Sequence, residues 1–213
     1  MSGLVITVAQ QKGGSGKTTV SAHLATSLLK KRKMTVAILD CDPQGSLGEW
    51  FEAREERLGE DETGLTFRTA SGWGARREAR SMARDYDAVI IDTPPKTDTE
   101  ARPAIEAASL VVVPVQPSPM DVWACGSTLA LAAKERTPAL MVLNRVPPRA
   151  SLTNEMADAL AEVDAPLAKT RIGNRVGFAA AMKQGLSLID TEPKSKGALE
   201  MLALRDEVLK AMK

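Results

Sequence analysis

The stretch that decides the fold is LVITVAQQKGGSGKTT, residues 4–19. Its first part, Leu4–Ala9, is a short apolar run of the kind that forms a buried strand. A glycine-rich segment follows, and from Lys17 onward apolar residues recur at the spacing of a helix. A strand, a glycine-rich loop and a helix in this order are the usual setting of a phosphate-binding loop.

The loop itself, Gly13–Thr18, contains the residue types that a triphosphate requires. Glycines let backbone N–H groups converge on a phosphate, and the helix N-terminus behind the loop adds partial positive charge. Lys17 can neutralise phosphate oxygens, and the hydroxyl of Thr18 can bind Mg²⁺. Two features are unusual. Position 11 is Gln rather than the customary first glycine, and a second lysine, Lys12, precedes the glycines.

The rest of the chain alternates between apolar runs and helical patterns. This alternation predicts an α/β fold in which helices flank a doubly wound, mostly parallel sheet, as one domain over residues 1–213. The charged and glycine-rich stretch 52–64 is expected to be a mobile loop. Further strands are expected near residues 35–39, 65–69, 86–91, 110–115 and 140–144, and helices near residues 76–84, 99–108, 121–135, 152–163, 174–184 and 196–212.

The composition limits the classes of function. Aromatic residues make up 3% of the chain, so the core rests on aliphatic side chains, as in a helix-flanked parallel sheet. The net charge of +1 excludes a general polycation, so any binding of nucleic acid needs a local patch. The sequence shows no signal peptide and no apolar stretch of about 18 residues. Together with two unpaired cysteines, Cys41 and Cys125, these features predict a cytoplasmic protein.

Three carboxylates follow predicted strands. Asp92 comes directly after the apolar run Ala88–Ile91, and Asp40 and Asp42 follow the second strand. In parallel sheets, ligands bind beyond the carboxyl ends of the strands. Asp92 is therefore expected to hold Mg²⁺, directly or through water. Asp40 and Asp42 could orient an attacking water and a metal-bound water, or could cap the helix that follows them.

Beyond these motifs, the chain resembles the ParA family of partition ATPases, in particular its small members without an N-terminal DNA-binding extension. These proteins belong, with MinD, to the deviant Walker A class of P-loop NTPases. The class pattern K-G-G-x-x-K-[ST] is satisfied by Lys12, Gly13, Gly14, Lys17 and Thr18. The resemblance covers nearly the whole chain in order, through QKGGSGKTT (11–19), LDCDPQGS (39–46), VIIDTPP (89–95), PVQPSPMDVWA (114–124), LNR (143–145) and PKSKGA (193–198).

The resemblance implies roles for these residues. Lys12 reaches across a two-fold dimer to the phosphates of the partner's ATP, as an arginine finger does in trans. Asp42 positions the hydrolytic water, and residues 93–95 begin a switch that senses the γ-phosphate. The implied catalytic residues are Lys12, Lys17 and Asp42, the implied Mg²⁺ residues are Thr18, Asp40 and Asp92, and the implied nucleotide contacts are Lys12, Gly13, Gly14, Ser15, Gly16, Lys17, Thr18, Thr19, Asn144, Arg145 and Pro193.

The resemblance also implies partners. ATP and Mg²⁺ drive a homodimer that binds nucleoid DNA without sequence preference, and a ParB-like or other cargo adaptor stimulates slow hydrolysis. Such DNA binding requires surface cations and weakens with salt. The preferred patch lies in residues 165–185, which contain no Asp or Glu, and consists of Lys169, Arg171, Arg175 and Lys183. Two other candidate patches are Lys30–Lys33 and the group Arg76, Arg77, Arg80 and Arg84.

Other functions stay open at this point. A MinD-like membrane switch is disfavoured because the closing helix carries Glu200, Asp206 and Glu207 and lacks aromatic residues, so no membrane partner is expected. An iron–sulphur reductase is disfavoured because Cys41 and Cys125 lack the placement of cluster ligands. A nucleotide-gated binding module, or an enzyme that uses ATP on a metabolite, would share the same loop.

Overall fold

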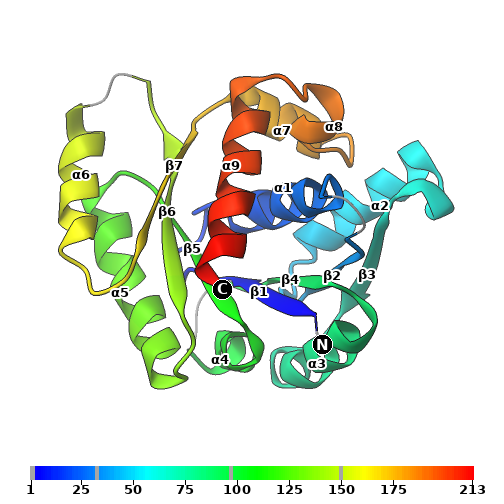
Figure 1. The fold of residues 1–213 in the computed structure, drawn as a ribbon, viewed down its shortest axis with the longest axis horizontal. Helices are drawn as coiled ribbons and strands as arrows, with labels where there is room; N and C mark the ends of the chain where they lie inside the picture. The colour runs from blue at the N-terminus through cyan, green and yellow to red at the C-terminus, as the bar shows by residue number, and fades with distance from the viewer. Residues whose placement is uncertain (1–2, 32–33, 96–97, 149–150) are drawn as a thin grey trace.

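The computed structural model describes residues 3–31, 34–95, 98–148 and 151–213. Within these residues, seven strands form one sheet in the order β3-β2-β4-β1-β5-β6-β7, and every neighbouring pair is parallel (Figure 1). The strand order changes direction at β1, so the loop after β1 lies where such sheets bind ligands. The strands are β1 Leu4–Val8, β2 Val36–Asp40, β3 Leu65–Thr69, β4 Ala88–Asp92, β5 Leu110–Val115, β6 Ala139–Val146 and β7 Leu167–Gly173.

Helices cover both faces of the sheet. One face packs against α1, α2, α7, α8 and α9, and the other packs against α3, α4, α5 and α6. The helices are α1 Lys17–Leu29, α2 Ser46–Leu58, α3 Ala75–Asp85, α4 Asp98–Ala107, α5 Pro119–Lys134, α6 Ser151–Ala161, α7 Val176–Met182, α8 Leu188–Thr191 and α9 Lys196–Ala211, with single 3₁₀ turns η1 Glu60–Glu62 and η2 Gly72–Gly74.

The two helical layers explain why the strands are apolar throughout. Successive side chains of a strand point to opposite faces. In β4, Ile90 joins the core under α1, while Val89 and Ile91 join the core under α3 and α4. Because both faces are buried, β4 appears in the sequence as a continuous apolar run rather than an alternating one. The α/β fold with a parallel sheet is therefore confirmed.

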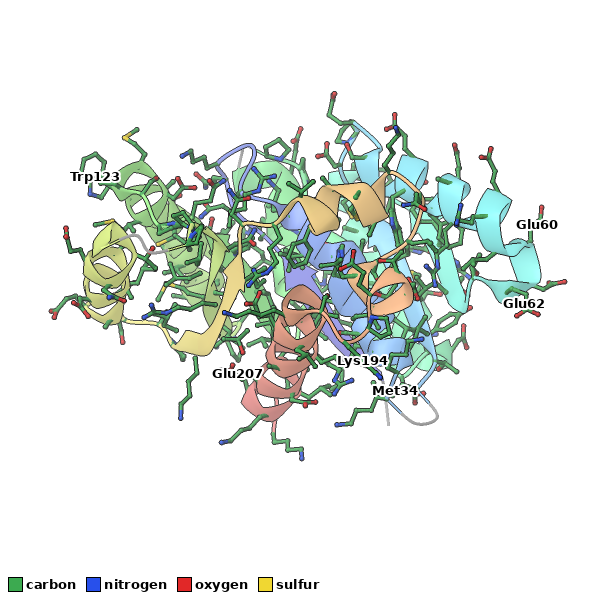
Figure 2. All side chains as sticks on the ribbon, turned by 90° about the horizontal axis from the view of Figure 1, so that it is seen from above. Met34, Glu60, Glu62, Trp123, Lys194 and Glu207 are labelled. Atoms are coloured by element: carbon green, nitrogen blue, oxygen red, sulfur yellow. The ribbon has the colours of Figure 1, made fainter. Side chains whose placement is uncertain are left out.

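Two local predictions differ from the structure. The strand β7 was not predicted, because its segment LAKTRIG alternates between buried residues and the exposed Lys169 and Arg171, as expected of an edge strand. The prediction of a mobile loop over residues 52–64 is wrong. Residues up to Leu58 belong to α2, and Figure 2 shows Glu60 and Glu62 at the end of the molecule beyond this helix.

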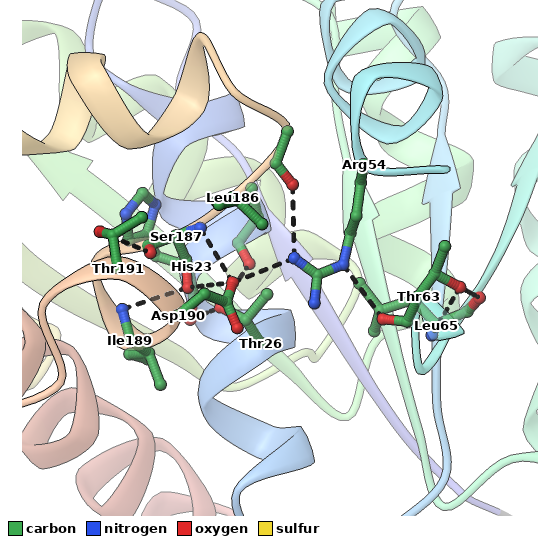
Figure 3. Close-up of polar contacts among 12 residues, drawn as sticks. His23, Thr26, Arg54, Thr63, Leu65, Leu186, Ser187, Ile189, Asp190 and Thr191 are labelled. Atoms are coloured by element: carbon green, nitrogen blue, oxygen red, sulfur yellow. Dashed lines mark hydrogen bonds and ion pairs between the residues drawn. The ribbon is translucent and has the colours of Figure 1, made fainter. Parts of the chain in front are cut away.

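The reason for the second error is Arg54, which is buried despite its charge (Figure 3). Its guanidinium donates to the carbonyl of Thr63 at 3.0 Å and to that of Gly185 at 3.3 Å, and it pairs with Asp190 at 3.0 Å. Trp50 of the same helix donates from Nε1 to the carbonyl of Leu186 at 3.1 Å. A buried charge is tolerated only when it is paired and hydrogen-bonded. These contacts fix α2 against α8 and the segment just before it.

The single histidine joins α1 to the same segment. His23 accepts a hydrogen bond at Nε2 from the backbone N–H of Leu188 at 3.1 Å, so Nδ1 carries the proton and donates to the carbonyl of Thr19 at 2.9 Å. Burial lowers the pKa of His23 from 6.5 to about 4, so the ring is neutral near pH 7.

In the described parts of the chain, no helix has the length and apolar character needed to cross a membrane.

Candidate nucleotide-binding site

The glycine loop connects β1 to α1, and two of its glycines adopt left-handed backbone conformations. Gly14 has φ of 76° and Gly16 has φ of 91°. A side chain at Gly14 would meet no neighbour, so the backbone conformation alone explains that glycine. At Gly16 a Cβ atom would also lie 2.5 Å from Nδ2 of Asn144, so space is limiting there as well. The loop sequence thus fixes the tight turn that precedes α1.

Neighbouring strands brace the loop. Asn144, at the end of β6, donates from Nδ2 to the carbonyl of Ser15 at 2.8 Å. Gln116, in the β5–α5 connection, donates from Nε2 to the carbonyl of Gly14 at 2.8 Å. The hydroxyl of Ser15 is buried and has no hydrogen-bond partner among the described residues. A buried hydroxyl in that position suits an oxygen-rich ligand, so the residues present fit a bound phosphate.

Lys17 begins α1, and its side chain is buried. Burial lowers the pKa of Lys17, and the negative charges of Asp92 and Asp42 oppose this shift. The ammonium group therefore lies in a poorly hydrated position beside the loop, where it interacts more strongly with an anion than it would in water. This is the placement expected for the cation that neutralises phosphate oxygens.

The carboxylate of Asp92 lies at the end of β4, directly beside the first turn of α1. Thr18 donates from Oγ1 to Oδ2 of Asp92 at 2.7 Å, and Ser21 donates from Oγ to Oδ1 at 2.9 Å. Burial raises the pKa of Asp92 to about 7, although the hydrogen bond from Thr18 opposes the shift. The hydroxyl of Thr18 and this carboxylate supply the oxygen ligands that Mg²⁺ prefers. Ser21 was not predicted, because a serine inside a helix carries no signal of its own.

Asp40 and Asp42 lie at the end of β2, and the sheet register pairs Asp40 with Asp92 on the neighbouring strand. The carboxylate of Asp40 accepts from the backbone N–H of Asp42 at 2.9 Å and from that of Gly48, in the first turn of α2, at 3.1 Å. Asp40 therefore caps α2 while lying beside the predicted metal residue. Burial raises the pKa of Asp40. Asp42 is only half-buried, and its Oδ1 accepts from the N–H of Gln44 at 3.0 Å.

A narrow pocket adjoins the glycine loop on the β6–β7 side. Asn144 and Arg145, two of the residues expected to contact the nucleotide, line it, and Arg145 holds a left-handed backbone conformation with φ of 53°. Phe178 of α7 contributes an aromatic wall that sequence reasoning missed. Pro193 does not line this pocket and is exposed in the turn before α9. The arrangement could hold a nucleobase between Asn144 and Phe178 while the loop holds the phosphates.

Lys12 lies at the edge of the loop, and 39% of its side chain is exposed. Its ammonium group forms an ion pair with Asp121 in the first turn of α5. Asp121 was not predicted as part of the site. The sequence does mark the start of its helix, because Ser118 followed by Pro119 is a typical helix N-terminus. Asp121 is therefore expected in the first turn of that helix.

The predicted DNA-binding residues are only partly brought together. Lys169, Arg171 and Arg175 line one open groove, which Lys196 of α9 joins, whereas Lys183 does not line it. Arg175 is paired with Glu200 of α9 at 2.8 Å. Residues 165–185 contain no acidic residue themselves, but the fold places an acidic residue of α9 next to them. In the other patches, Arg76 is paired with Glu106 at 2.6 Å, and residues 32 and 33 of Lys30–Lys33 lie outside the described residues.

Known proteins match this chain over most of its length. The CobQ/CobB/MinD/ParA nucleotide binding domain matches residues 6–189. A "Maintenance of carboxysome distribution protein A" from Gloeobacter kilaueensis is 32% identical over 195 residues, with 90% of this chain and 86% of that protein covered. The chromosome-partitioning ATPase Soj of Thermus thermophilus is 30% identical over 236 aligned positions, with 96% of this chain and 94% of that protein covered.

Solved structures share the fold. The septum site-determining protein MinD of Pyrococcus horikoshii, in complex with Mg-ADP, has a TM-score of 0.80 at 21% identity, covering 96% of this chain and 95% of that one. A Cyanothece McdA–ATP complex has a TM-score of 0.74 at 17% identity, covering 99% of this chain and 96% of that one. The chain thus belongs to the CobQ/CobB/MinD/ParA nucleotide-binding family and is a small ATPase of the ParA/MinD positioning type.

Proposed function

We propose that this chain is a partition-type ATPase whose ATP-bound homodimer binds DNA without sequence preference and releases it after hydrolysis. The observation that carries the proposal is the partly exposed Lys12 at the edge of a fully formed phosphate loop. An ATPase that acted alone would need only the buried Lys17. A second, outward-lying lysine suits a site that is completed by another copy of the chain.

The chemistry is assigned to few residues. Lys17 and the loop hold the triphosphate, and Asn144 and Arg145 lie beside the base. Asp42, which is half-buried at the end of β2, orients the water that attacks the γ-phosphorus, so that the bond to ADP breaks and phosphate leaves. Mg²⁺, when bound by Thr18 and Asp92 with Asp40 nearby, neutralises charge on the phosphate oxygens.

DNA binding is assigned to the groove lined by Lys169, Arg171 and Lys196. Contacts between such cations and phosphates need no base-specific geometry, so they give affinity without sequence preference. Arg175 is less available because Glu200 neutralises it. Location at the nucleoid follows from this assignment.

A membrane-bound switch is less favoured because the apolar face of α9 is occupied. Met201, Leu204 and Val208 of this helix are buried in the core beside α1. A helix that inserts into a membrane surface needs a free apolar face.

The relatives named above include one named for carboxysome distribution and one named for chromosome partitioning. An adaptor protein that stimulates hydrolysis, of the ParB type or another, would connect the ATPase to either kind of cargo.

The direct test measures ATP turnover of the wild-type chain and of Asp42→Ala, with and without DNA. We expect slow turnover by the wild type, and a long-lived ATP-bound dimer retained on DNA for Asp42→Ala. Normal turnover by Asp42→Ala would exclude its role in positioning water. Binding of the ATP-bound protein to anionic vesicles but not to DNA would favour the membrane switch.

A further inference from the structure

Two large apolar side chains project from the start of α5 without a partner that covers them. Met120 is 61% exposed and Trp123 is 72% exposed. Figure 2 shows Trp123 at one end of the molecule, pointing outward from α5. Two large apolar residues that are both exposed on one helical turn, three positions apart in sequence, are unusual on a surface that has no binding role.

These residues flank Asp121, and Asp121 holds Lys12. Ser118 caps the helix by accepting from the backbone N–H of Asp121 at 3.2 Å, so the first turn of α5 is well defined. Gln116, just before it, is bonded to the carbonyl of Gly14 in the phosphate loop at 2.8 Å. The start of α5 is therefore attached to the loop at two points, and Met120 and Trp123 are carried with it.

This attachment has a geometric consequence. A second copy whose nucleotide lies within reach of Lys12 must also lie close to the first turn of α5, because Lys12 and Asp121 are in contact. We propose that Met120 and Trp123 form the apolar contact between two copies of this chain in the ATP-bound dimer. The inference rests on the proposed function, since it assumes that Lys12 acts across the dimer.

A second copy is a better occupant than an unrelated protein. In a two-fold dimer each residue of the interface occurs twice, so one exposed Trp per chain provides two apolar contacts. Tryptophan is the residue type that most often contributes strongly to binding at interfaces. Its position beside a cation assigned to the partner's phosphates gives the interface an apolar part next to its charged part.

The test compares Trp123→Ala with Trp73→Ala. Trp73 is the matched control, because it is 86% exposed but lies in η2 beside the arginines of α3, on the β3 side of the sheet. Dimerisation is measured by sedimentation velocity with a non-hydrolysable ATP analogue and Mg²⁺. We expect Trp123→Ala to raise the dimer dissociation constant ~10-fold or more, with unchanged nucleotide affinity of the monomer, and Trp73→Ala to leave both unchanged.

Equal dimerisation of Trp123→Ala and wild type would overturn the inference, as would equal losses in both variants. A wild-type chain that stays monomeric with the analogue would instead contradict the proposed function.

Fluorescence provides a test without truncating Trp123. In a Trp73→Phe protein, whose other tryptophan, Trp50, is buried, dimerisation should shift the emission of Trp123 to shorter wavelength; an unchanged spectrum in a protein that does dimerise contradicts the contact.

Discussion

Lys12 and Asp121 are 109 residues apart in sequence, yet Nζ of Lys12 lies 2.5 Å from Oδ2 of Asp121. The Asp121 carboxylate is buried, and its other oxygen, Oδ1, has no hydrogen-bond partner among the described residues. Removing one partner of such a pair leaves an uncompensated buried charge, which is unfavourable. In the single chain, therefore, the lysine proposed to act on a second copy is held by its own chain, and under that proposal Lys12 would leave this pair when the dimer forms.

Neutralising the holding residue should make dimerisation easier. In Asp121→Asn the amide keeps the shape of the carboxylate, but departure of Lys12 no longer leaves a buried charge. We expect the ATP-bound dimer to form at ~5-fold lower protein concentration or less, measured by light scattering. The control is Glu135→Gln, which removes a carboxylate paired with Arg102 at the other end of α5. Unchanged or weaker dimerisation of Asp121→Asn would contradict the idea that Lys12 leaves Asp121 when the dimer forms.

Charge reversal in the groove should weaken DNA binding. Lys169→Glu together with Arg171→Glu removes two cations that face the groove and adds two negative charges. We expect the affinity for double-stranded DNA to fall ~10-fold or more and its salt dependence to become shallower, while ATP affinity stays the same. Lys183→Glu is the matched control, because Lys183 is exposed but does not line the groove. If Lys183→Glu has the larger effect, the DNA-binding surface lies elsewhere.

The neutral, buried His23 should make folding stability depend on pH. The pKa of His23 is about 4 in the folded chain, whereas the ordinary value, expected in the unfolded chain, is 6.5. At a pH between these two values, the unfolded state therefore binds more protons than the folded state. Stability from this group is present above pH 6.5 and is lost as the pH falls toward 4. We expect a loss of about 2 kcal/mol between pH 7 and pH 5.

The contribution of His23 is isolated by comparison with His23→Gln in urea denaturation at both pH values. The variant removes the titrating ring, so its stability should fall less on acidification than that of the wild type. Parallel stability curves for the two proteins would show that His23 does not carry the effect.

Strands and turns could be predicted from the sequence where the local residue pattern and the packing of the fold agree. The apolar runs of β1 and β4 are continuous because helices cover both faces of the sheet. The run of β1 leads into the glycine loop, and the run of β4 ends at Asp92. Gly14 and Gly16 are required by left-handed backbone conformations, which follow from the loop motif itself. The fold could therefore be predicted from these apolar runs, whereas the phosphate site inferred from residues 4–19 and the strand-end carboxylates stays a prediction.

Contacts between distant segments could not be predicted in the same way. Arg54 looked like part of a charged loop because two of its partners, the carbonyl of Gly185 and the carboxylate of Asp190, are more than 130 residues away. The basic stretch 165–185 looked free of acidic residues until the fold placed Glu200 beside Arg175. The role of Lys12 stays a prediction, and nothing in its neighbourhood in sequence indicated its contact with Asp121.

The central claim is that ATP binding and dimerisation are separate properties of one loop, assigned to Lys17 and Lys12. The most direct measurement is sedimentation of Lys12→Ala with Mg-ATP, alongside its nucleotide affinity, with Lys17→Ala as the variant that should lose binding altogether. We predict that Lys12→Ala binds ATP with an affinity within about 3-fold of the wild type but stays monomeric at concentrations where the wild type is a dimer. A normal ATP-dependent dimer of Lys12→Ala would contradict the account.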